Sequence, residues 1–426
     1  MIYSVIILCG GKGSRSEDPS KPKILQKIGP DPILKYIVKA FDSSDHKIQL
    51  IFVGGWKSEF ILNDLETLSH EFSNLEIEFV VESNPSGTTN AVKLGLEKSK
   101  SDVVMVVMGD LFIPNSLIKY FKIFESSNSD LMFLSHPNNH PQDSDLVRYN
   151  SENLQVNEII LKNSSRSLVE GNMAISGVLV ASSTFLSGLD TVHRDLIEAM
   201  TFTPSKSQIK IVTFPIIDPI HDIGTPTRVE RMSKLHKRLT SRKFNSALFV
   251  DLDNTLIPNL EVKNKNSRFS LSEDIARALS EFSELDVPIF IVTNQPGIAK
   301  GFFSWSDFDD FREKFESELV KFDAYISRWF VCPHHPESGF VGENISLKIE
   351  CLCRKPGAKF AELAKIEYNL SLEDSWMVGD NLRDLNFALN ASLQFIGASV
   401  DGLNLDKTLK STSKALQSLV SYYADN

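Results

Sequence analysis

Two apolar runs constrain the fold of this chain most strongly, because one leads into a glycine-rich turn and the other into two aspartates. Residues 5–15 read VIILCGGKGSR and end in glycines, and residues 247–259 read ALFVDLDNTLIPN and contain two aspartates one residue apart. An unpaired carboxylate inside a strand is costly, whereas the carboxyl ends of strands in open α/β sheets are where ligands bind. We therefore expect these runs to be the first strands of two separate α/β enzyme domains.

Length, composition and charge limit the class of protein. A chain of 426 residues is too long for a single domain with one hydrophobic core. Its 42% hydrophobic and 23% charged residues are typical of soluble globular proteins. The net charge of -10 argues against a nucleic-acid binder, although a local basic cluster is enough for small anionic substrates. No apolar run approaches the roughly 18 residues of a membrane span, and the N-terminus is typical of a strand rather than a signal peptide. We expect a cytoplasmic protein without nucleic-acid or membrane partners; the sequence leaves its oligomeric state open.

The first half alternates short apolar runs with helical patterns, as parallel sheets do. The predicted strands are 2–8, 48–53, 75–81 and 103–108, and the predicted helices are 32–41, 58–70 and 89–98. The irregular segment 136–172 predicts substrate loops or an inserted hairpin. A basic amphipathic pattern over 228–243 predicts a helix, with either a solvated face or a phosphate-binding one.

A second alternation begins at residue 246. Its predicted strands are 246–251, 288–293, 327–331, 375–379 and 393–396, and its predicted helices are 272–284, 305–321, 358–367 and 382–390. The pattern predicts two doubly wound Rossmann-like domains of the α/β class. We place the first domain at residues 1–235, a linker at 236–245 and the second domain at 246–426.

The first candidate site follows the first strand. The stretch LCGGKGSRSEDPSKPKIL lets backbone N–H groups approach phosphate oxygens and adds cations to neutralise their charge, through Gly10, Gly11, Gly13, Arg15, Lys21 and Lys23. A glycine turn alone is common in folds without such a function. Three further stretches strengthen the functional interpretation: VVMGDLF with Asp110, ESNPSGTTNAV with Gly87, and HDIGTP with Asp222.

Taken in this order, the glycine turn, Lys23, Asp110 and the late DIGTP resemble the sugar-1-phosphate nucleotidyltransferases, in particular their heptose-phosphate guanylyltransferase-like branch. The resemblance implies a nucleotidyltransferase fold. It implies that the glycines and Arg15 hold a nucleoside triphosphate, that Lys23 contacts phosphate and that Asp110 and Asp222 hold Mg²⁺. Alignment and charge neutralisation would then let a sugar phosphate oxygen attack the α-phosphorus and release pyrophosphate.

Two departures from that family fall where the sugar would bind. The stretch IILKN keeps Lys162 as a substrate-binding residue but has Leu161 where the family has glutamate, and AISGV has Ser176 and Gly177 in place of the usual Asn-Ala-Gly. The identity of the sugar is therefore open. A nucleotide-binding domain that no longer catalyses is the alternative.

The second candidate site starts at DLDNT. Residues i and i+2 of a strand point to one side, so Asp251 and Asp253 can face one crevice. The motifs FIVTNQPGIAKG, CRKPG and WMVGDNLRDLNFA follow in order, and together with DLDNT they resemble the haloacid dehalogenase-like phosphatases. The resemblance implies that Asp251 is the nucleophile and Asp253 the general acid and base. It further implies that Thr293, Asn294 and Lys355 bind the phosphoryl group and that Asp251, Asp253 and Asp380 bind Mg²⁺.

Three of the four cysteines lie close together in the sequence of this second half. A C-x-H pair and a C-x-C pair supply three thiolates and an imidazole, a closed tetrahedral set typical of structural zinc. The predicted ligands are Cys332, His334, Cys351 and Cys353. His335 is a competing imidazole, and reduced thiols in a core are the alternative to a metal. The site would fix a loop that continues into Arg354 and Lys355.

The stretches VTNQPGIAKG, CPHHPE and CLCRKP narrow the resemblance to the heptose-1,7-bisphosphate phosphatases, for which Arg354 would also bind substrate. Leu252, Asn254 and Asn381 depart from that family near the substrate. Removal of the 7-phosphate leaves a sugar 1-phosphate, the substrate type of the first domain. The resemblance thus implies a bifunctional enzyme of NDP-heptose synthesis and favours GTP as the nucleotide. The alternatives are another sugar phosphate or CTP, or an active phosphatase joined to a non-catalytic nucleotide-binding domain.

Overall fold

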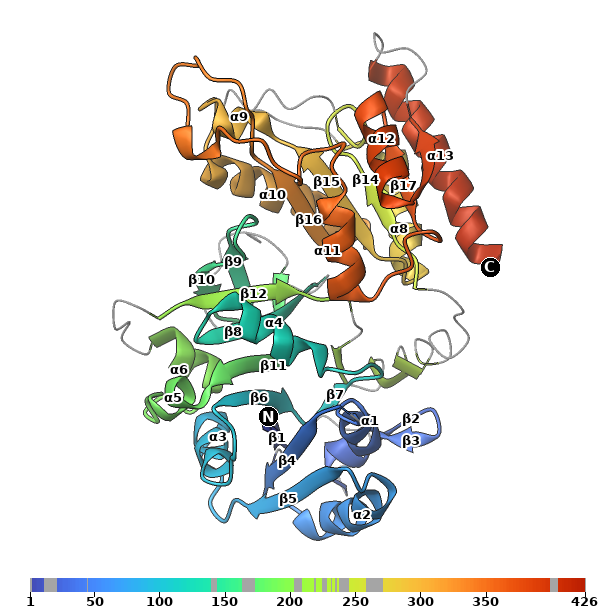
Figure 1. Cartoon of the computed structure of the whole chain (residues 1–426). Helices are drawn as coiled ribbons and strands as arrows, with labels where there is room; N and C mark the ends of the chain where they lie inside the picture. The colour runs from blue at the N-terminus through green and yellow to red at the C-terminus, as the bar shows by residue number, and fades with distance from the viewer. Residues whose placement is uncertain are drawn as a thin grey trace. The chain divides into compact units, whose positions relative to one another are not determined.

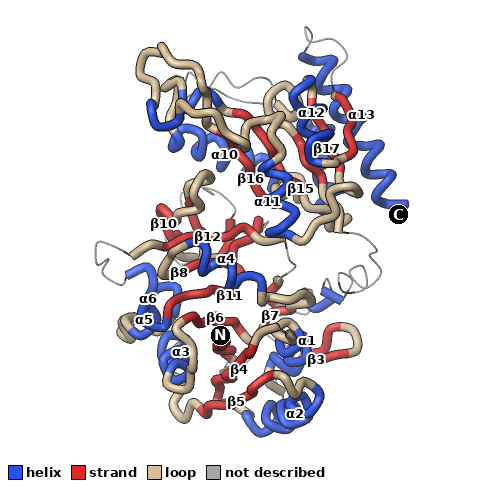
Figure 2. The backbone as a smooth tube through the Cα atoms, in the orientation of Figure 1, coloured by secondary structure: helices blue, strands red, loops and turns tan. Residues whose placement is uncertain are grey.

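The chain forms two compact units. The computed structural model describes residues 2–10, 21–43, 45–138, 144–162, 173–202, 209–217, 220–223, 228–230, 232–233, 236, 245–257, 271–398 and 405–425. Contacts group residues 1–135, 175–214 and 218–242 into the first unit, and residues 136–174, 215–217 and 243–426 into the second. The described residues of segment 136–174 are thus grouped with the second unit, although the segment precedes the predicted linker in the sequence. Figure 1 labels the elements of both units, and Figure 2 shows that helices and strands alternate in each.

A sheet with a parallel centre forms the core of the first unit. Its strand β1 (Ile2–Leu8) lies between β4 (Lys47–Gly54) and β6 (Val103–Met108), parallel to both, and β5 (Leu75–Val81) extends the sheet beyond β4. The interior of β1 is fully buried because the strand is apolar on both faces. On the other side of β6 the antiparallel β11 (Met173–Ser182) follows, then β8 (Leu131–Pro137) and β12 (Ile211–Pro215). The four predicted strands are confirmed.

Helices α1 (Ile33–Lys39), α2 (Ser58–Glu71) and α3 (Thr88–Leu96) connect these strands, close to the bounds that the sequence predicts. Helices α4 (Lys119–Ser127), α5 (Ser183–Ser187) and α6 (Leu196–Phe202) follow. Four two-residue strands form two small sheets, with β2 (Lys27–Ile28) on β3 (Asp31–Pro32) and β7 (Leu111–Phe112) on β13 (His221–Asp222). The basic helix predicted over 228–243 lies mostly outside the described residues.

The second unit has a five-stranded parallel sheet in the order β16-β15-β14-β17-β18. The first strand in the sequence, β14 (Leu248–Val250), is central, which brings its carboxyl end next to those of β15 (Ile289–Asn294) and β17 (Trp376–Gly379). The outer strands are β16 (Arg328–Cys332) and β18 (Gln394–Gly397). All five strands lie within a residue or two of their predicted ranges.

The helices of the second unit are α8 (Glu273–Glu284), α9 (Pro296–Ala299), α10 (Trp305–Val320), α11 (Lys359–Tyr368), α12 (Leu382–Ala391) and α13 (Leu405–Asp425). A capping box of Ser304 and Asp307 begins α10, and one of Asn381 and Asp384 begins α12. The antiparallel hairpin of β9 (Leu146–Tyr149) and β10 (Val156–Ile160) also belongs to this unit. It confirms the predicted inserted hairpin. In the described part of the chain, no helix is long and apolar enough to cross a membrane.

Candidate active sites and metal centre

The carboxyl ends of three parallel strands bring the predicted phosphatase residues together. Asp251 directly follows β14, and Asp380 follows β17. The Nζ atom of Lys355 lies 2.6 Å from Oδ1 of Asp251 and 2.7 Å from Oδ1 of Asp384. Lys355 and both carboxylates are almost completely buried. A cation between two acids offsets much of the cost of burying them.

The electrostatics of this group favour a further ligand. Burial raises the pKa of Asp251 to about 7, against the opposing effect of Lys355. Burial would lower the pKa of Lys355, but Asp251 and Asp384 outweigh it and raise that pKa. Among the described residues, neither Nζ of Lys355 nor Oδ1 of Asp384 has an aligned hydrogen-bond partner. An anionic phosphoryl oxygen at the ammonium and a cation at the carboxylates would satisfy both atoms.

Three carboxylates could hold that cation. Oxygen atoms of Asp251, Asp380 and Asp384 all lie within 4.8 Å of one another. Hard oxygen donors in this number suit Mg²⁺, which keeps several waters when it binds proteins. Asp253, a predicted ligand, is not in this group. Asp384 is the third member of the group instead. The sequence places Asp384 one helical turn after Asp380 but does not indicate that it could bind a metal.

Asp384 also orients the start of α12. Its Oδ2 accepts hydrogen bonds from the backbone N–H groups of Asp380 and Asn381, both at 3.2 Å. Its other oxygen, Oδ1, faces Lys355. The D-N-x-x-D spacing before an apolar run is the signal in the sequence that could have identified this residue as a capping carboxylate.

Gln295 positions the second aspartate of DLDNT. Its Nε2 donates to Oδ2 of Asp253 at 2.6 Å and to Oγ1 of Thr293 at 3.0 Å. Thr293, predicted to bind phosphate, is buried beside it. Gln295 itself was not singled out in the sequence, although it belongs to the VTNQ stretch. The hydrogen bond from Gln295 fixes the orientation of the Asp253 carboxylate. A fixed orientation suits a carboxylate that donates and accepts protons during catalysis.

Asn294 contacts the backbone of the loop that carries the lysine. Its Oδ1 accepts from the N–H of Lys355 at 2.9 Å, and its Nδ2 donates to the carbonyl of Lys355 at 3.1 Å. The side chain therefore fixes the position of Lys355, and its predicted contact with substrate remains a prediction. Arg354 donates from Nη1 to the carbonyl of His334 at 3.2 Å, so the loop is held on both sides.

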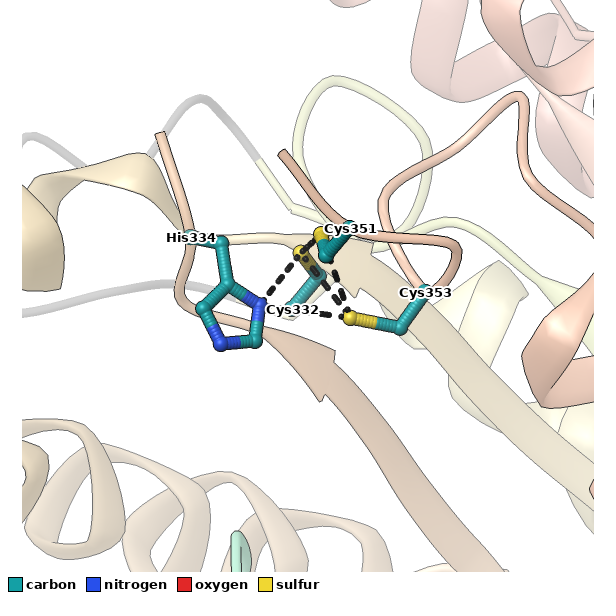
Figure 3. A group of neighbouring side chains, drawn as sticks. All are labelled: Cys332, His334, Cys351 and Cys353. Atoms are coloured by element: carbon teal, nitrogen blue, oxygen red, sulfur yellow. Dashed lines mark hydrogen bonds between the residues drawn. The ribbon is translucent and has the colours of Figure 1, made fainter. Parts of the chain in front are cut away.

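The predicted cysteine and histidine residues converge on one point (Figure 3). The donor atoms of Cys332, His334, Cys351 and Cys353 lie within 4.8 Å of one another. The three sulfur–sulfur distances are 3.4–3.6 Å, and Nδ1 of His334 lies 3.3 Å from Sγ of Cys353. Zn–S bonds of about 2.3 Å in a tetrahedron separate sulfurs by about 3.8 Å. The donor set and its spacing fit zinc, and His335 is not part of the group.

In the first unit, Lys23 and Asp110 form an ion pair with Nζ and Oδ2 3.2 Å apart. Asp110 follows β6, where Gly109 donates to the carbonyl of Leu8 at 2.9 Å and a Cβ atom would come within 2.6 Å of that oxygen. Only glycine therefore fits before this aspartate. The pairing of β13 with β7 places Asp222 opposite Leu111, the residue after Asp110. The two predicted Mg²⁺ ligands thus come from neighbouring strands, and Asp222 also contacts Arg228.

The turn before α3 is built around Gly87. Its φ of 117° disfavours other residues, and a Cβ atom would lie 2.3 Å from the carbonyl oxygen of Arg194. The buried Glu82 was not identified from the sequence: its Oε1 accepts from the N–H of Ser86 at 3.2 Å, and its Oε2 faces Gly10. The signal available in the sequence was the position of Glu82 at the start of the ESNPSG stretch, which leads into the turn at Gly87.

Gly11, Gly13 and Arg15 lie outside the described residues. Lys162 belongs to the second unit, where its N–H donates to Oδ1 of Asp145 at 2.8 Å and its Nζ lies 3.5 Å from Oδ2. Its predicted contact with a sugar phosphate remains a prediction.

Known proteins resemble the two halves separately. The family model described as a MobA-like NTP transferase domain matches residues 5–194, and a HAD-hydrolase-like model matches residues 352–410. The D-glycero-beta-D-manno-heptose-1,7-bisphosphate 7-phosphatase of Haemophilus influenzae is 32% identical over 150 residues, which cover 35% of this chain and 79% of that protein. A D-glycero-alpha-D-manno-heptose-1,7-bisphosphate 7-phosphatase of Campylobacter jejuni is 32% identical over 147 residues, which cover 34% and 78%.

Among solved structures, HddC from Yersinia pseudotuberculosis complexed with GMP-PN resembles 55% of this chain over 99% of its own length. Its sequence identity is 21% and its TM-score is 0.43. The two family matches fall on the two predicted enzyme halves, so the chain joins a nucleotidyltransferase domain to a haloacid dehalogenase-like phosphatase domain.

Proposed function

Because this chain belongs to the family of the D-glycero-D-manno-heptose-1,7-bisphosphate 7-phosphatases, we propose that it carries out two consecutive steps of NDP-heptose synthesis. The second unit removes the 7-phosphate of a heptose 1,7-bisphosphate. The first unit transfers a nucleotidyl group to the resulting heptose 1-phosphate and releases pyrophosphate. Relatives of this chain include enzymes named for the beta and for the alpha anomer.

The position of Lys355 between Asp251 and Asp384 is the observation that carries the phosphatase assignment. Asp251 attacks phosphorus and forms an aspartyl-phosphate, while Asp253 donates a proton to the leaving sugar oxygen. Asp253 then takes a proton from the water that hydrolyses the intermediate. Lys355 stabilises the charge that develops on the phosphoryl oxygens, and Mg²⁺ at Asp251, Asp380 and Asp384 would neutralise the rest.

The zinc ion that we propose has a structural role. Three thiolates and an imidazole leave no open coordination position, so the metal has no place for substrate or water. Zinc would connect the end of β16 to the loop that carries Arg354 and Lys355. Its role would be to hold these two side chains where the substrate phosphate needs them.

In the first unit, the pair of Lys23 and Asp110 with the neighbouring Asp222 supports nucleotidyl transfer. Lys23 would neutralise a phosphate of the triphosphate, and the two carboxylates would hold Mg²⁺, which supplies charge stabilisation at the α-phosphate. Arg15 and the glycines of the turn would complete the triphosphate site.

GTP as the nucleotide can be tested at Glu82, a buried carboxylate that accepts from the N–H of Ser86 and faces Gly10. A carboxylate accepts hydrogen bonds only, and guanine alone offers two adjacent donors, N1–H and N2–H, on one edge. Cytosine, uracil and adenine place acceptors beside their donors on the corresponding edge. Replacement of Glu82 by glutamine should therefore reduce the preference for GTP over CTP and ATP. An unchanged preference would contradict a role for Glu82 in base selection.

One experiment tests both activities. The purified protein is incubated with Mg²⁺, heptose 1,7-bisphosphate of each anomer and the four nucleoside triphosphates, and the products are identified by mass spectrometry. A single NDP-heptose with free phosphate is expected. Asp251→Asn should stop phosphate release but leave transfer to supplied heptose 1-phosphate intact, and Asp110→Asn should do the reverse. Phosphate release without any NDP-sugar, for either anomer, would favour another sugar or a non-catalytic first domain.

A further inference from the structure

The hairpin of β9 and β10 docks on α10 through charged side chains, although its sequence lies within the transferase half. Arg148 on β9 binds Glu313 on α10 in a two-pronged ion pair, with Nη2 2.8 Å from Oε2 and Nε 3.3 Å from Oε1. The residues of both elements belong to the second unit. Such paired contacts are the strongest that arginine makes with a carboxylate.

A second arginine completes the contact from the opposite side. The side chain of Arg312 on α10 is 1% exposed, and its Nη2 donates to the carbonyl of Tyr149 at 3.1 Å. Its guanidinium lies 4.3 Å from the centre of the Tyr149 ring. Ser151, just after β9, donates from Oγ to Oδ1 of Asp309 at 2.9 Å. The hairpin thus contributes donors, an acceptor and a ring to a buried charge cluster.

This cluster needs the hairpin. Burial raises the pKa of Asp309, Glu313 and Glu316, which shows the cost of burying three acids on one helix. Arg312 is the cation of α10 within the cluster, and Arg148 adds a second from the hairpin. Removing one partner of a buried charge pair leaves the other uncompensated.

The cluster continues toward the cysteine and histidine group. Oε1 of Glu316 accepts from Nε1 of Trp329 at 2.9 Å, and Trp329 lies on β16, whose last residue is Cys332. Sγ of Cys332 lies 3.5 Å from Sγ of Cys353. Cys353 in turn lies two residues before Lys355.

We propose that the β9–β10 hairpin is a positioning element of the phosphatase, in which Arg148 and Ser151 hold α10 and β16 so that the cysteine and histidine group keeps Arg354 and Lys355 in place. The inference rests on the phosphatase activity proposed above. It means that a segment within the transferase sequence completes the phosphatase, and that the two halves cannot be exchanged freely between such fusions.

The test compares variants of the full chain. Arg148→Ala and Ser151→Ala remove the two hairpin contacts, and Arg148→Glu combined with Glu313→Arg reverses the ion pair. Arg277→Ala is the matched control, because Arg277 forms an exposed ion pair with Glu273 on α8 of the same unit. The readouts are kcat and KM for heptose 1,7-bisphosphate, the rate of zinc release to a chelator, and hydrogen exchange of β16.

Arg148→Ala should raise KM and speed zinc release by about tenfold, because a charged hydrogen bond contributes about 1.5 kcal/mol or more. Ser151→Ala should act in the same direction more weakly, the charge reversal should restore part of the loss, and Arg277→Ala should match the parent. Parental kinetics, zinc release and β16 exchange in folded Arg148→Ala and Ser151→Ala would overturn the inference. If the parent does not hydrolyse the bisphosphate, the proposed function fails, and unchanged exchange of β16 would still overturn the positioning role.

Discussion

The ammonium of Lys355 lies 2.6 Å from Oδ1 of Asp251, a carboxylate oxygen of the proposed nucleophile. A carboxylate and an ammonium buried together attract each other strongly, and this attraction has to weaken when substrate arrives. The phosphoryl group brings its own negative charge to Lys355. Substrate therefore replaces Asp251 as the partner of the lysine and frees the carboxylate for attack.

Replacement of Lys355 by methionine tests this relationship. We expect kcat of the phosphatase to fall by about 10² to 10³-fold, the effect of removing one preorganised charge-stabilising donor from an active site. Nucleotidyl transfer to supplied heptose 1-phosphate should remain at the parental rate. Lys359→Met is the control, since Lys359 is an exposed residue at the start of α11. Parental kcat in Lys355→Met would refute the proposed role of the lysine.

The raised pKa of Asp251 predicts proton-linked magnesium binding. Because this pKa is about 7, the carboxyl of the metal-free protein is largely protonated below that pH and ionised above it. Mg²⁺ has to displace the proton, so its apparent affinity should fall by up to about tenfold for each pH unit below 7. Calorimetry in buffers of different ionisation enthalpy measures the proton released. Asp251→Asn should remove this release, and its persistence in that variant would assign the proton to another group.

The same carboxyl links stability to pH. Folding raises its pKa, so the folded metal-free protein binds the proton more tightly than the unfolded chain. Its contribution to stability is therefore lost as the pH rises from the ordinary range of an aspartate toward 7. Mg²⁺ should restore stability above pH 7. Thermal unfolding at pH 6 and pH 8 with and without Mg²⁺ measures this, and a stabilisation by Mg²⁺ that is greater at pH 6 would contradict it.

The fold could be predicted from the sequence where hydrophobic periodicity was strong. Most parallel strands of both units are largely apolar runs, and glycines or acids mark the carboxyl ends of several, so their positions followed directly; β5, with Glu76 and Glu78, is partly polar. The antiparallel β8, β11 and β12 were not predicted: β8 ends at the start of the irregular segment 136–172, β11 follows that segment, and β12 lies further along the chain. Their order in the sheet depends on long-range pairing that no local pattern records.

The candidate sites could be predicted where ligand spacing is local. The C-x-H and C-x-C pairs identified four converging donors, and Asp251 and Asp380 follow the ends of β14 and β17 as expected, with Lys355 on the loop before α11. Gln295 could not be assigned, because its role depends on which strand lies beside which. Asp384 and Glu82 had local signals, but only the structure shows what their carboxylates contact. The contact of Arg148 with Glu313 joins residues far apart in the sequence, and nothing in either local stretch indicates it.

Removal of the Asp384 carboxylate should destabilise the second unit. In Asp384→Ala, two backbone N–H groups at the start of α12 lose their acceptor, and buried Lys355 loses one of its two acids. We expect the free energy of unfolding to fall by about 3–5 kcal/mol, as when one partner of a buried ion pair is removed. Urea unfolding measures it, with the exposed Glu373→Ala as the control. A loss below about 1 kcal/mol would mean that water replaces the carboxylate at little cost.

Replacement of Cys351 by serine should disrupt the metal centre. We expect zinc content, measured by mass spectrometry of the native protein, to fall well below that of the parent, because serine does not supply a thiolate. Phosphatase KM should rise as the loop of Arg354 and Lys355 loosens, while nucleotidyl transfer remains. Cys9→Ser is the matched control, because Cys9 is a buried thiol of the first unit that donates to the carbonyl of Val53. Parental zinc content in Cys351→Ser would exclude Cys351 as a ligand.

The contact between Gln295 and Asp253 predicts a loss of rate without a loss of binding. In Gln295→Leu the carboxylate of Asp253 loses the donor that lies 2.6 Å away and can rotate away from the leaving oxygen. General acid–base catalysis contributes about 10² to 10⁴-fold, so partial misplacement should lower kcat by about tenfold or more. KM should change little, because the role we propose for Gln295 is to orient Asp253 rather than to bind substrate. Quenched-flow measurement of the aspartyl-phosphate separates the two displacements, and both should slow, since Asp253 acts in each. Gln394→Leu is the control, because the side chain of Gln394, on the outer strand β18, donates to the carbonyl of Glu373. A rise in KM at parental kcat would instead make Gln295 a substrate-binding residue.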